Sequence, residues 1–325
     1  MSKESQNHPG MNTPYDDAFK SVVQKCPTLA LFLINELFFR RGLSDEEYTG
    51  KEQVELLDKE LPRLGSGSLE MDMRILVKGV TERKFHLECE STPDGRVIIR
   101  MVQYNMMSAL ADANYEKAVI RTRIDDSGVL FLRSTSQTPD VMTVELTVPQ
   151  NKVISYQIPV LKIQNYTLDS ILEKKLYLLL PFLFFNYEKQ LRLAKEDQMI
   201  YEQIQNLYAQ ILQNLESHTE QGLINAYEAS TLYDALRIVL EGLGRTNESE
   251  KEVKQIMGGK LLEFSADHIY YAGEAAGEQI GEKNGEDKLG RLISILLETT
   301  RYDDASKAAS DPEVRKKLYA EFGIA

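Results

Sequence analysis

The sequence predicts a mixed α/β fold, of the α/β or α+β kind, followed by an all-helical C-terminal region. Apolar residues recur at every second position through much of residues 69–90, which is the spacing of half-buried strands. Stretches with helical spacing of apolar residues precede and follow this segment, and from Thr167 onward only the helical pattern continues. A mixed sheet flanked by helices, with further helices after it, satisfies these observations.

The chain is expected to begin with a disordered segment and then a helix. Residues 1–12 show no periodicity. Thr13 suits a helix N-cap, Pro14 suits the first helical position, and Asp16 suits the third, so a helix is predicted to start here. Residues 40–68 are charged and then rich in glycine and serine, which is typical of a mobile connection.

The segment with period two divides into two strands joined by a short loop. In the first strand, apolar residues share one face and charged residues the other: Met71, Met73, Ile75 and Val77, against Asp72 and Arg74. The sequence KGVTER at 78–83 suits a hairpin loop. In the second strand, apolar residues alternate with a histidine and two acids: Phe85, Leu87 and Cys89, against His86, Glu88 and Glu90. We therefore predict an antiparallel hairpin with one core face.

Helices and short strands are predicted for the rest of the chain. A helical pattern runs from about residue 97 to 117, and β-like runs follow at 119–124, 128–134, 141–147 and 153–163. Helices then begin at Thr167, with a break at Pro181, and continue as amphipathic stretches at 196–218, 225–242 and 250–272. These patterns predict a domain at 13–166, a helical extension packing on it at 167–247, and a helical tail at 248–325.

The helical tail contains a repeat of Gly-Glu followed by two variable residues, between positions 273 and 288. Glycine costs a helix about 1 kcal/mol per position relative to alanine, so four regularly spaced glycines need a reason. Close helix–helix approach in a homodimer is one interpretation, and a flexible tether is the other. Residues 287–325 are then predicted to form two or three short helices around Asp311 and Pro312.

Composition limits the classes of protein that fit. Hydrophobic residues make up 42% of the chain and charged residues 27%, which is ordinary for a soluble globular protein. The longest apolar runs fall far short of the roughly 20 residues of a membrane-spanning helix, so no membrane partner is expected. Two cysteines cannot build a disulfide framework, which favours a reducing cytoplasm. The net charge of −12 argues against binding of polyanions through overall charge, but not against a local basic groove or a bound metal.

Three acids are predicted to lie close together on the hairpin. Glu88 and Glu90 point to the same side of one strand, and Asp72 lies opposite one of them if paired residue numbers sum to 160 or 162. Adjacent carboxylates repel one another unless protons or a cation separate them. Oxygen ligands of this kind suit Mg²⁺ or Mn²⁺, so a metal site is one interpretation. The other is that the acids lie on the solvent-exposed face of a half-buried strand.

Other polar residues are candidates for the same site or for contacts with DNA. His86 shares the face of the acids, where it could act as a general base or metal ligand, or serve the fold alone. Cys89 points the opposite way and is expected to be a small core residue. Four arginines are candidates for contacts with a DNA backbone, the alternative being ordinary surface residues: Arg96, Arg100, Arg121 and Arg123.

The order of these motifs resembles that of the PD-(D/E)XK nuclease superfamily, and within it the recombination-promoting nuclease and putative transposase branch. TPYDDAFK, with Asp16, Phe19 and Lys20, resembles the opening helix of that family. MDMRILV is similar to the strand with the family's aspartate, HLECES to the segment with its glutamate, and IRMVQYN to a helix carrying Arg100 and Tyr104. A later segment, SYQIPVLKIQNYTLDSILEKKLYLLLPFLFFNYEK, resembles the part that closes the family's core.

The resemblance covers most of residues 13–195 and implies a restriction-endonuclease-like core in a bacterial protein. It implies hydrolysis of DNA phosphodiester bonds that depends on Mg²⁺ or Mn²⁺. Asp72 and Glu88 would bind the metal together with the backbone carbonyl of Cys89, and Asp16 would complete or orient the site. A divalent ion in such a site polarises the phosphoryl oxygen and activates a water molecule.

The chain departs from the family pattern at Glu90, where the family has lysine or glutamine. A glutamate cannot donate a charge-assisted hydrogen bond to phosphate. Glu90 could instead bind a second metal ion, act as a general base, or mark a site that has lost catalysis. Lys20, Arg100 and His86 are the nearby donors that could replace the missing one. The alternative function is therefore a catalytically degenerate nuclease fold that binds DNA or proteins.

Overall fold

The computed structural model divides the chain into two compact units, Met1–Leu262 and Glu263–Ala325. In the first unit it describes residues 13–57, 60–62, 68–92 and 96–258, and in the second a set of residues between 288 and 322. The predicted disordered N-terminus, residues 1–12, lies outside the described residues. So do the four glycines of the Gly-Glu repeat, on which the predicted homodimer depends.

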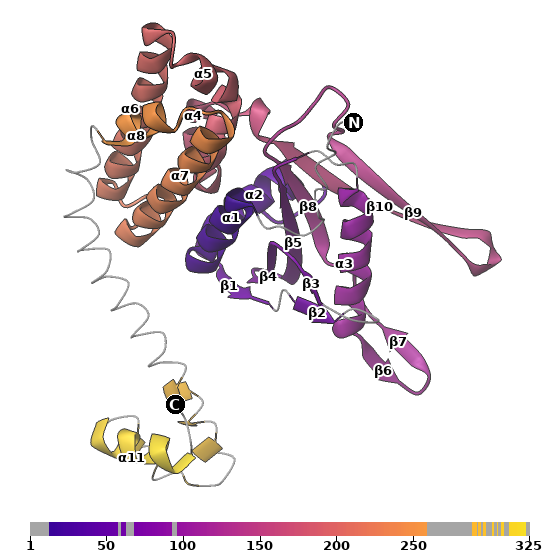
Figure 1. Ribbon diagram of the computed structural model, residues 1–325. Coiled ribbons are helices and arrows are strands. Elements are labelled where there is room, and N and C mark those ends of the chain that lie inside the picture. Colours follow the sequence, from indigo (N-terminus) through magenta and orange to yellow (C-terminus); the bar gives the residue numbers. More distant parts are fainter. Residues whose placement is uncertain are drawn as a thin grey trace, which may run out of the picture. The chain divides into compact units, whose positions relative to one another are not determined.

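The first unit is built around a six-stranded mixed sheet in the order β1-β4-β5-β8-β10-β9 (Figure 1). Its strands are β1 Gln53–Leu56, β4 Met73–Lys78, β5 Glu82–Glu90, β8 Asp126–Phe131, β9 Val141–Val148 and β10 Lys152–Lys162. β8 runs parallel to both β5 and β10, and the other neighbours are antiparallel. Two short pairs form separate ladders: β2 Glu60–Pro62 with β3 Ser68–Glu70, and β6 Asn114–Glu116 with β7 Val119–Arg121. The predicted mixed α/β class is confirmed.

Strands β4 and β5 form the predicted hairpin. Met73 lies opposite Leu87 and Lys78 opposite Glu82, so paired residue numbers sum to 160. This is one of the two values that bring the acids together. Because Asp72 directly precedes β4, the register places it opposite Glu88.

Both faces of this hairpin are buried. The apolar face is closed to solvent as predicted, and the polar residues of the other face are buried as well: Asp72, Arg74, His86, Glu88 and Glu90. The interpretation that the acids lie on a solvent-exposed face is therefore wrong. The physical reason is α3, Val97–Ala111, whose side chains reach that face at His86 and Glu90.

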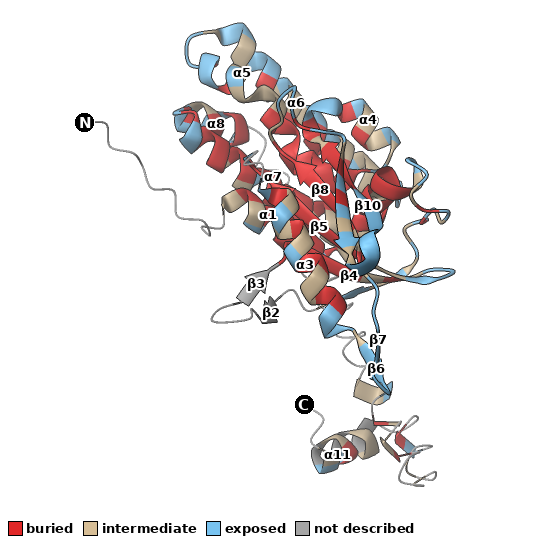
Figure 2. Cartoon of the chain, turned by 90° about the vertical axis from the view of Figure 1, so that its right-hand side faces the viewer, coloured by how far each residue is buried: buried red, intermediate tan, exposed pale blue. Residues whose placement is uncertain are grey.

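Helices cover the sheet from both sides (Figures 1 and 2). On one side, α3 packs against buried apolar residues of β8, β9 and β10: Val129, Phe131, Met142, Val144, Ile158 and Val160. On the other side lies the helical segment after α1 (Pro14–Lys25), which comprises η1 Pro27–Leu29, α2 Ala30–Ile34 and η2 Asn35–Phe39. The rings of Phe38 and Phe85 meet there, with centroids 5.3 Å apart. The polar face of β5 is thus turned toward α3 and its apolar face toward η2.

Gly128 in β8 occupies a position where the core admits no side chain. A Cβ atom there would lie 2.9 Å from Leu87 Cδ2 and 3.1 Å from Leu37 Cδ1. We expect Gly128→Ala to lower the free energy of unfolding by about 1–3 kcal/mol in urea titrations, because overpacking forces neighbouring side chains from their rotamers. Gly258→Ala is the matched control, since no atom lies within 4 Å of its Cβ position. Equal destabilisation of both variants would contradict the explanation.

The described chain after the sheet is helical as far as residue 258. The helices are α4 Leu168–Glu173, η5 Tyr177–Tyr187, α5 Glu188–Leu193, α6 Gln198–Glu220, α7 Ala226–Thr246 and α8 Glu250–Gly258. Thr167 caps α4 through a capping box. Pro181 lies inside η5, which is a 3₁₀ segment, and proline removes a hydrogen bond that an α-helix would need. η5 packs on α1, where the rings of Tyr15 and Phe185 meet with centroids 4.9 Å apart.

Two local predictions are wrong. The predicted connection at 40–68 contains β1, whose mostly exposed residues give no clear alternation and which forms by pairing with β4. The helix after Val97 ends at Ala111 because the β6–β7 hairpin follows it. Lys117 and Ala118 at its turn have φ values of 47° and 67°, as a tight hairpin turn requires.

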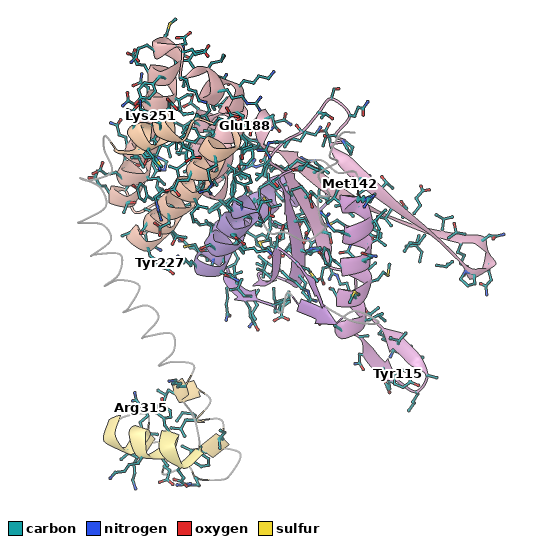
Figure 3. The ribbon with its side chains drawn as sticks, viewed as in Figure 1. Tyr115, Met142, Glu188, Tyr227, Lys251 and Arg315 are labelled. Carbon is teal, nitrogen blue, oxygen red and sulfur yellow. The ribbon has the colours of Figure 1, made fainter. Side chains whose placement is uncertain are left out.

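Strands β9 and β10 extend from the sheet as an antiparallel arm (Figure 3). Val141 pairs with Pro159 at one end, and Val148 with Lys152 at the other. Met142, at the base of the arm beside α3, is buried, whereas residues near the tip are exposed. The arm is therefore anchored in the core only through its base.

The N-terminal helices meet at a sharp bend. Pro14–Lys25 and Pro27–Phe39 are inclined by 106°, and as a pair they would be long and apolar enough to cross a membrane. Among the described residues, no single helix meets that condition. Most apolar side chains of this pair are buried within the first unit.

The second unit has a small apolar core of its own. Its buried members are Leu292, Leu296, Ala308 and Leu318. The helix α11, Pro312–Phe322, begins at the proline that the sequence marked as a break between short helices.

Candidate functional site

Six residues that the sequence singled out lie together as three pairs of an acid and a base. The pairs are Asp72 with Lys20, Glu88 with His86, and Glu90 with Arg100. The acids come from the β4–β5 hairpin, and the bases from three different elements: α1, β5 and α3. The fold therefore brings together candidates that are as much as 80 residues apart in the sequence.

Asp72 and Glu88 are tied to each other through backbone amides. The N–H of Asp72 donates to Glu88 Oε1 over 3.1 Å, and the N–H of Cys89 donates to Asp72 Oδ2 over 2.9 Å. Lys20 Nζ lies 3.4 Å from Asp72 Oδ1, and His86 Nε2 lies 2.8 Å from Glu88 Oε1. Asp72 is 8% exposed and Glu88 is 4% exposed. The two carboxylates thus act as hydrogen-bond acceptors at the place where the β4–β5 ladder ends.

The electrostatics of the pair favour an additional positive charge. Burial raises the pKa of the Asp72 carboxyl well above its ordinary value, and the nearby charge of Glu88 raises it further. The N–H of Cys89 and the ammonium of Lys20 act in the opposite direction without cancelling these effects. A proton or a cation at the two carboxylates would relieve the repulsion between them.

Two supporting residues predicted from the sequence lie beside the pairs. Asp16 is part of the capping box of α1, where its Oδ2 accepts a hydrogen bond from the N–H of Thr13 over 2.9 Å. Its charge adds to the raised pKa of Asp72, and burial raises the pKa of Asp16 itself. Tyr104 of α3 packs edge-on against the ring of His86, with centroids 5.2 Å apart.

Cys89 is a buried residue, as predicted, and burial raises the pKa of its thiol well above the ordinary value. Its backbone direction is set by its neighbours. The carbonyl of Glu90 accepts a hydrogen bond from the N–H of Leu132, beyond the end of β8. Backbone groups of successive strand residues point to opposite sides, and the N–H of Cys89 points to Asp72. The Cys89 carbonyl therefore lies on the Asp72 side of β5, which is the side its predicted ligand role needs.

A second polar cluster under α3 was missed in the sequence. Arg74 Nε donates to Asp125 Oδ2 over 2.8 Å, and Arg74 also pairs with Asp112. Ser108 of α3 donates to the same Asp125 oxygen over 2.6 Å. Arg74 could have indicated this cluster, because in the strand alternation it lies on the same face as Asp72.

Asn105 of α3 was also missed. Its Oδ1 lies 3.5 Å from His86 Nδ1 and accepts a hydrogen bond from Ser127 Oγ over 2.6 Å. Its Nδ2 donates to the hydroxyl of Tyr156 over 3.4 Å. Asn105 is fully buried. An asparagine on the inner face of an otherwise apolar helix was the sequence signal that could have identified it.

The arginines proposed for DNA contacts lie at two ends of α3. Arg96 directly precedes the helix, and Arg100 lies in its first turns, paired with Glu90. Arg121 and Arg123 follow the helix, on and just after β7, and both are exposed. The structure therefore places Arg100 in the candidate site, through its pairing with Glu90.

The predicted ligand set is divided in the structure. Among the described residues, no three His, Cys, Asp or Glu side chains are arranged to hold a metal ion. Asp72 and Glu88 are joined through the backbone, whereas Glu90 is paired with Arg100. Comparisons with protein-family models, curated proteins and solved structures found no match to this chain.

Proposed function

We propose that this chain is a metal-dependent DNA endonuclease of the recombination-promoting or transposase-associated type, which hydrolyses phosphodiester bonds. The observation that carries the proposal is the buried Asp72–Glu88 pair. Backbone N–H groups donate hydrogen bonds to both carboxylates, and the ammonium of Lys20 lies beside Asp72. Buried carboxylates need a compensating charge. A divalent cation supplies one, and the phosphates of DNA supply further oxygen ligands to it.

The arrangement of elements supports a restriction-endonuclease-like core for this proposal. The motifs that carry the resemblance occur in the order α1, β4, β5 and α3. Asp72 directly precedes β4 and Glu88 lies near the end of β5, so antiparallel pairing brings them together. Lys20 and Arg100 reach the same place from the two helices.

The residues present fit Mg²⁺ or Mn²⁺. Two carboxylates and the carbonyl of Cys89 offer hard oxygen donors, and these ions commonly take one or two protein carboxylates with water molecules in the remaining positions. The raised pKa of Asp72, caused by burial and by the charge of Glu88, supports the proposal because a cation would relieve the same repulsion. Asp72, Glu88 and the Cys89 carbonyl would hold the ion, which when bound would polarise a phosphoryl oxygen and lower the pKa of a water molecule.

The other side chains have roles that follow from their contacts. Lys20 holds the Asp72 carboxylate from the side of α1 and keeps a positive charge beside the site. Arg100 is held by Glu90, and its side chain is 34% exposed, so its guanidinium can also meet a phosphate. Glu90 in this proposal does not replace the family's lysine directly. It orients an arginine that supplies the missing donor.

The second candidate function is a catalytically degenerate nuclease fold that binds DNA or proteins. The observation that favours it is the pairing of each predicted acid with a base of this same chain. The pairs with Lys20 and Arg100 place cationic groups at two of the acids without a metal ion. The two candidates differ in whether the parent chain nicks DNA.

A nicking assay separates the two candidates. Supercoiled plasmid is incubated with the full chain and Mg²⁺ or Mn²⁺, beside Glu88→Gln and the matched control Glu145→Gln, which changes an exposed acid of β9. We expect Glu88→Gln to lower the nicking rate at least about 100-fold, because a neutral amide holds a divalent ion poorly. The control should nick at the parent rate. Absence of nicking by the parent would overturn the endonuclease proposal, and equal nicking by Glu88→Gln would overturn the site.

A further inference from the structure

The Glu88 carboxylate is the end of a chain of buried polar side chains. His86 Nε2 lies 2.8 Å from Glu88 Oε1, and the other ring nitrogen lies 3.5 Å from Asn105 Oδ1. Asn105 in turn contacts the hydroxyls of Ser127 on β8 and Tyr156 on β10. One carboxylate at the end of β5 is thus connected through α3 to two further strands.

The position of His86 favours an indirect role over the direct ones that its residue type first suggested. The ring is buried, and both nitrogens face groups of this same chain. A general base must reach the proton of a substrate or water with a free nitrogen. A metal ligand must present a nitrogen lone pair to the ion. An ionised Glu88 can only accept a hydrogen bond, so Nε2 of His86 carries a proton directed at it.

Neighbours on two sides fix the orientation of the His86 ring. Tyr104 packs edge-on against it, and Asn105 stands at its Nδ1 side. Asn105 is itself held by Ser127 Oγ over 2.6 Å and by Tyr156. The donor that meets Glu88 therefore comes from a rigid group, and hydrogen-bonded partners of this kind orient carboxylates toward a bound ion.

We propose that His86 and Asn105 are positioning residues, which fix the direction of the Glu88 carboxylate. Asn105 confines the ring by contact at its Nδ1 side, and the Nε2–H of the ring holds Glu88 Oε1 so that the carboxylate stays turned toward Asp72. The proposal rests on the proposed metal-dependent function, since it concerns the affinity of this site for a divalent ion. Neither residue touches the reacting groups.

Binding of Mn²⁺ to the full chain tests the proposal without using catalysis. We expect His86→Phe, which keeps a ring beside Tyr104 but has no donor, to weaken Mn²⁺ affinity about 10–100-fold in electron paramagnetic resonance titrations. His86→Gln places an amide N–H near the position of Nε2 and should restore most of the affinity. Asn105→Ala should weaken binding in the same range. Ser108→Ala is the matched control, because it also removes a buried hydrogen bond from α3 but keeps the parent affinity.

Nitrogen-15 spectra of the histidine rings supply an independent readout, and the chain has only four histidines. The His86 signals, assigned as those missing from His86→Phe, should show a fixed, protonated Nε2 in the parent, and Asn105→Ala should lose that fixed state. Parent-like Mn²⁺ affinity in both His86→Phe and Asn105→Ala would overturn the proposal, as would an unprotonated Nε2. If the parent binds no Mn²⁺, the metal-dependent function fails. The ring spectra then decide the positioning role alone, and an unchanged ring in Asn105→Ala overturns it.

Discussion

Asp72→Asn is expected to abolish plasmid nicking and, at pH 7 without divalent ions, to raise the melting temperature of the chain. Activity is lost because the amide removes one of the two carboxylates proposed to hold the metal. Stability rises because a buried charge that repels Glu88 is removed, while the asparagine oxygen still accepts the hydrogen bond from Cys89. Each kcal/mol gained should raise the melting temperature by about 2–4 °C in a unit of this size.

The sign of the pH dependence follows from the raised pKa of Asp72. The folded chain holds a proton on Asp72 more tightly than the unfolded chain, whose carboxyl titrates near the ordinary value of 3.8. The contribution of Asp72 to the free energy of unfolding is therefore full below that pH and is lost as pH rises toward the raised pKa. Scanning calorimetry of parent and variant should show curves that converge toward pH 3.8 and separate above it.

Divalent ions should reverse the order of stability found without them. Mn²⁺ binds the folded parent and raises its melting temperature, whereas Asp72→Asn gains little from the ion. Glu145→Gln, at an exposed position of β9, should behave like the parent in both conditions. A variant less stable than the parent at pH 7 without divalent ions would contradict the electrostatic explanation.

Arg74→Met should be among the most destabilising single substitutions in the sheet, lowering the free energy of unfolding by about 3–5 kcal/mol. The side chain of Arg74 is 5% exposed and that of Asp125 is 3% exposed. Methionine fills much of the volume of the arginine but leaves the Asp125 carboxylate buried without its cationic partner. Urea unfolding measures the loss.

Two comparisons show whether the lost partner is the cause. Arg74→Met combined with Asp125→Leu should recover much of the stability, because an apolar pair replaces a buried ion pair at little cost. Arg237→Met removes the exposed partner of Glu241 on α7 and should cost less than about 1 kcal/mol. A single Arg74→Met variant within that smaller range would show that the ion pair contributes little.

The hairpin, and which of its residues share a face, could be predicted because both depend on local sequence patterns. The alternation of apolar and polar residues fixes the faces of each strand, and the loop at 79–81 is short enough to leave few registers. The residues on α1 and α3 became candidates through the resemblance to the nuclease family, and not through these local patterns. Local sequence patterns do not predict which basic residue pairs with each acid. The pairing of Glu90 with Arg100, and not with the other acids, depends on how α3 lies across the sheet.

The burial of the polar face could not be predicted for a related reason. A strand with polar residues on one face looks half-exposed unless a polar helix face is known to cover it. Asn105 and Ser108 supply that polar face on α3, between apolar residues that meet the rest of the sheet. The short strand β1 was missed because its pairing with β4, and not its own pattern, stabilises it.

Every residue from Phe85 to Ser91 is buried, which limits the substitutions that this segment can accept during evolution. Each position is constrained by the folding of the chain, whether or not the site turns over a substrate. A descendant that had lost activity would still be selected to keep most of FHLECES, since charged and apolar positions alike are fitted to neighbours. Conservation of FHLECES among relatives would therefore indicate that the fold is conserved. Inheritance of catalysis would be better judged from groups that are only partly buried, such as the guanidinium of Arg100.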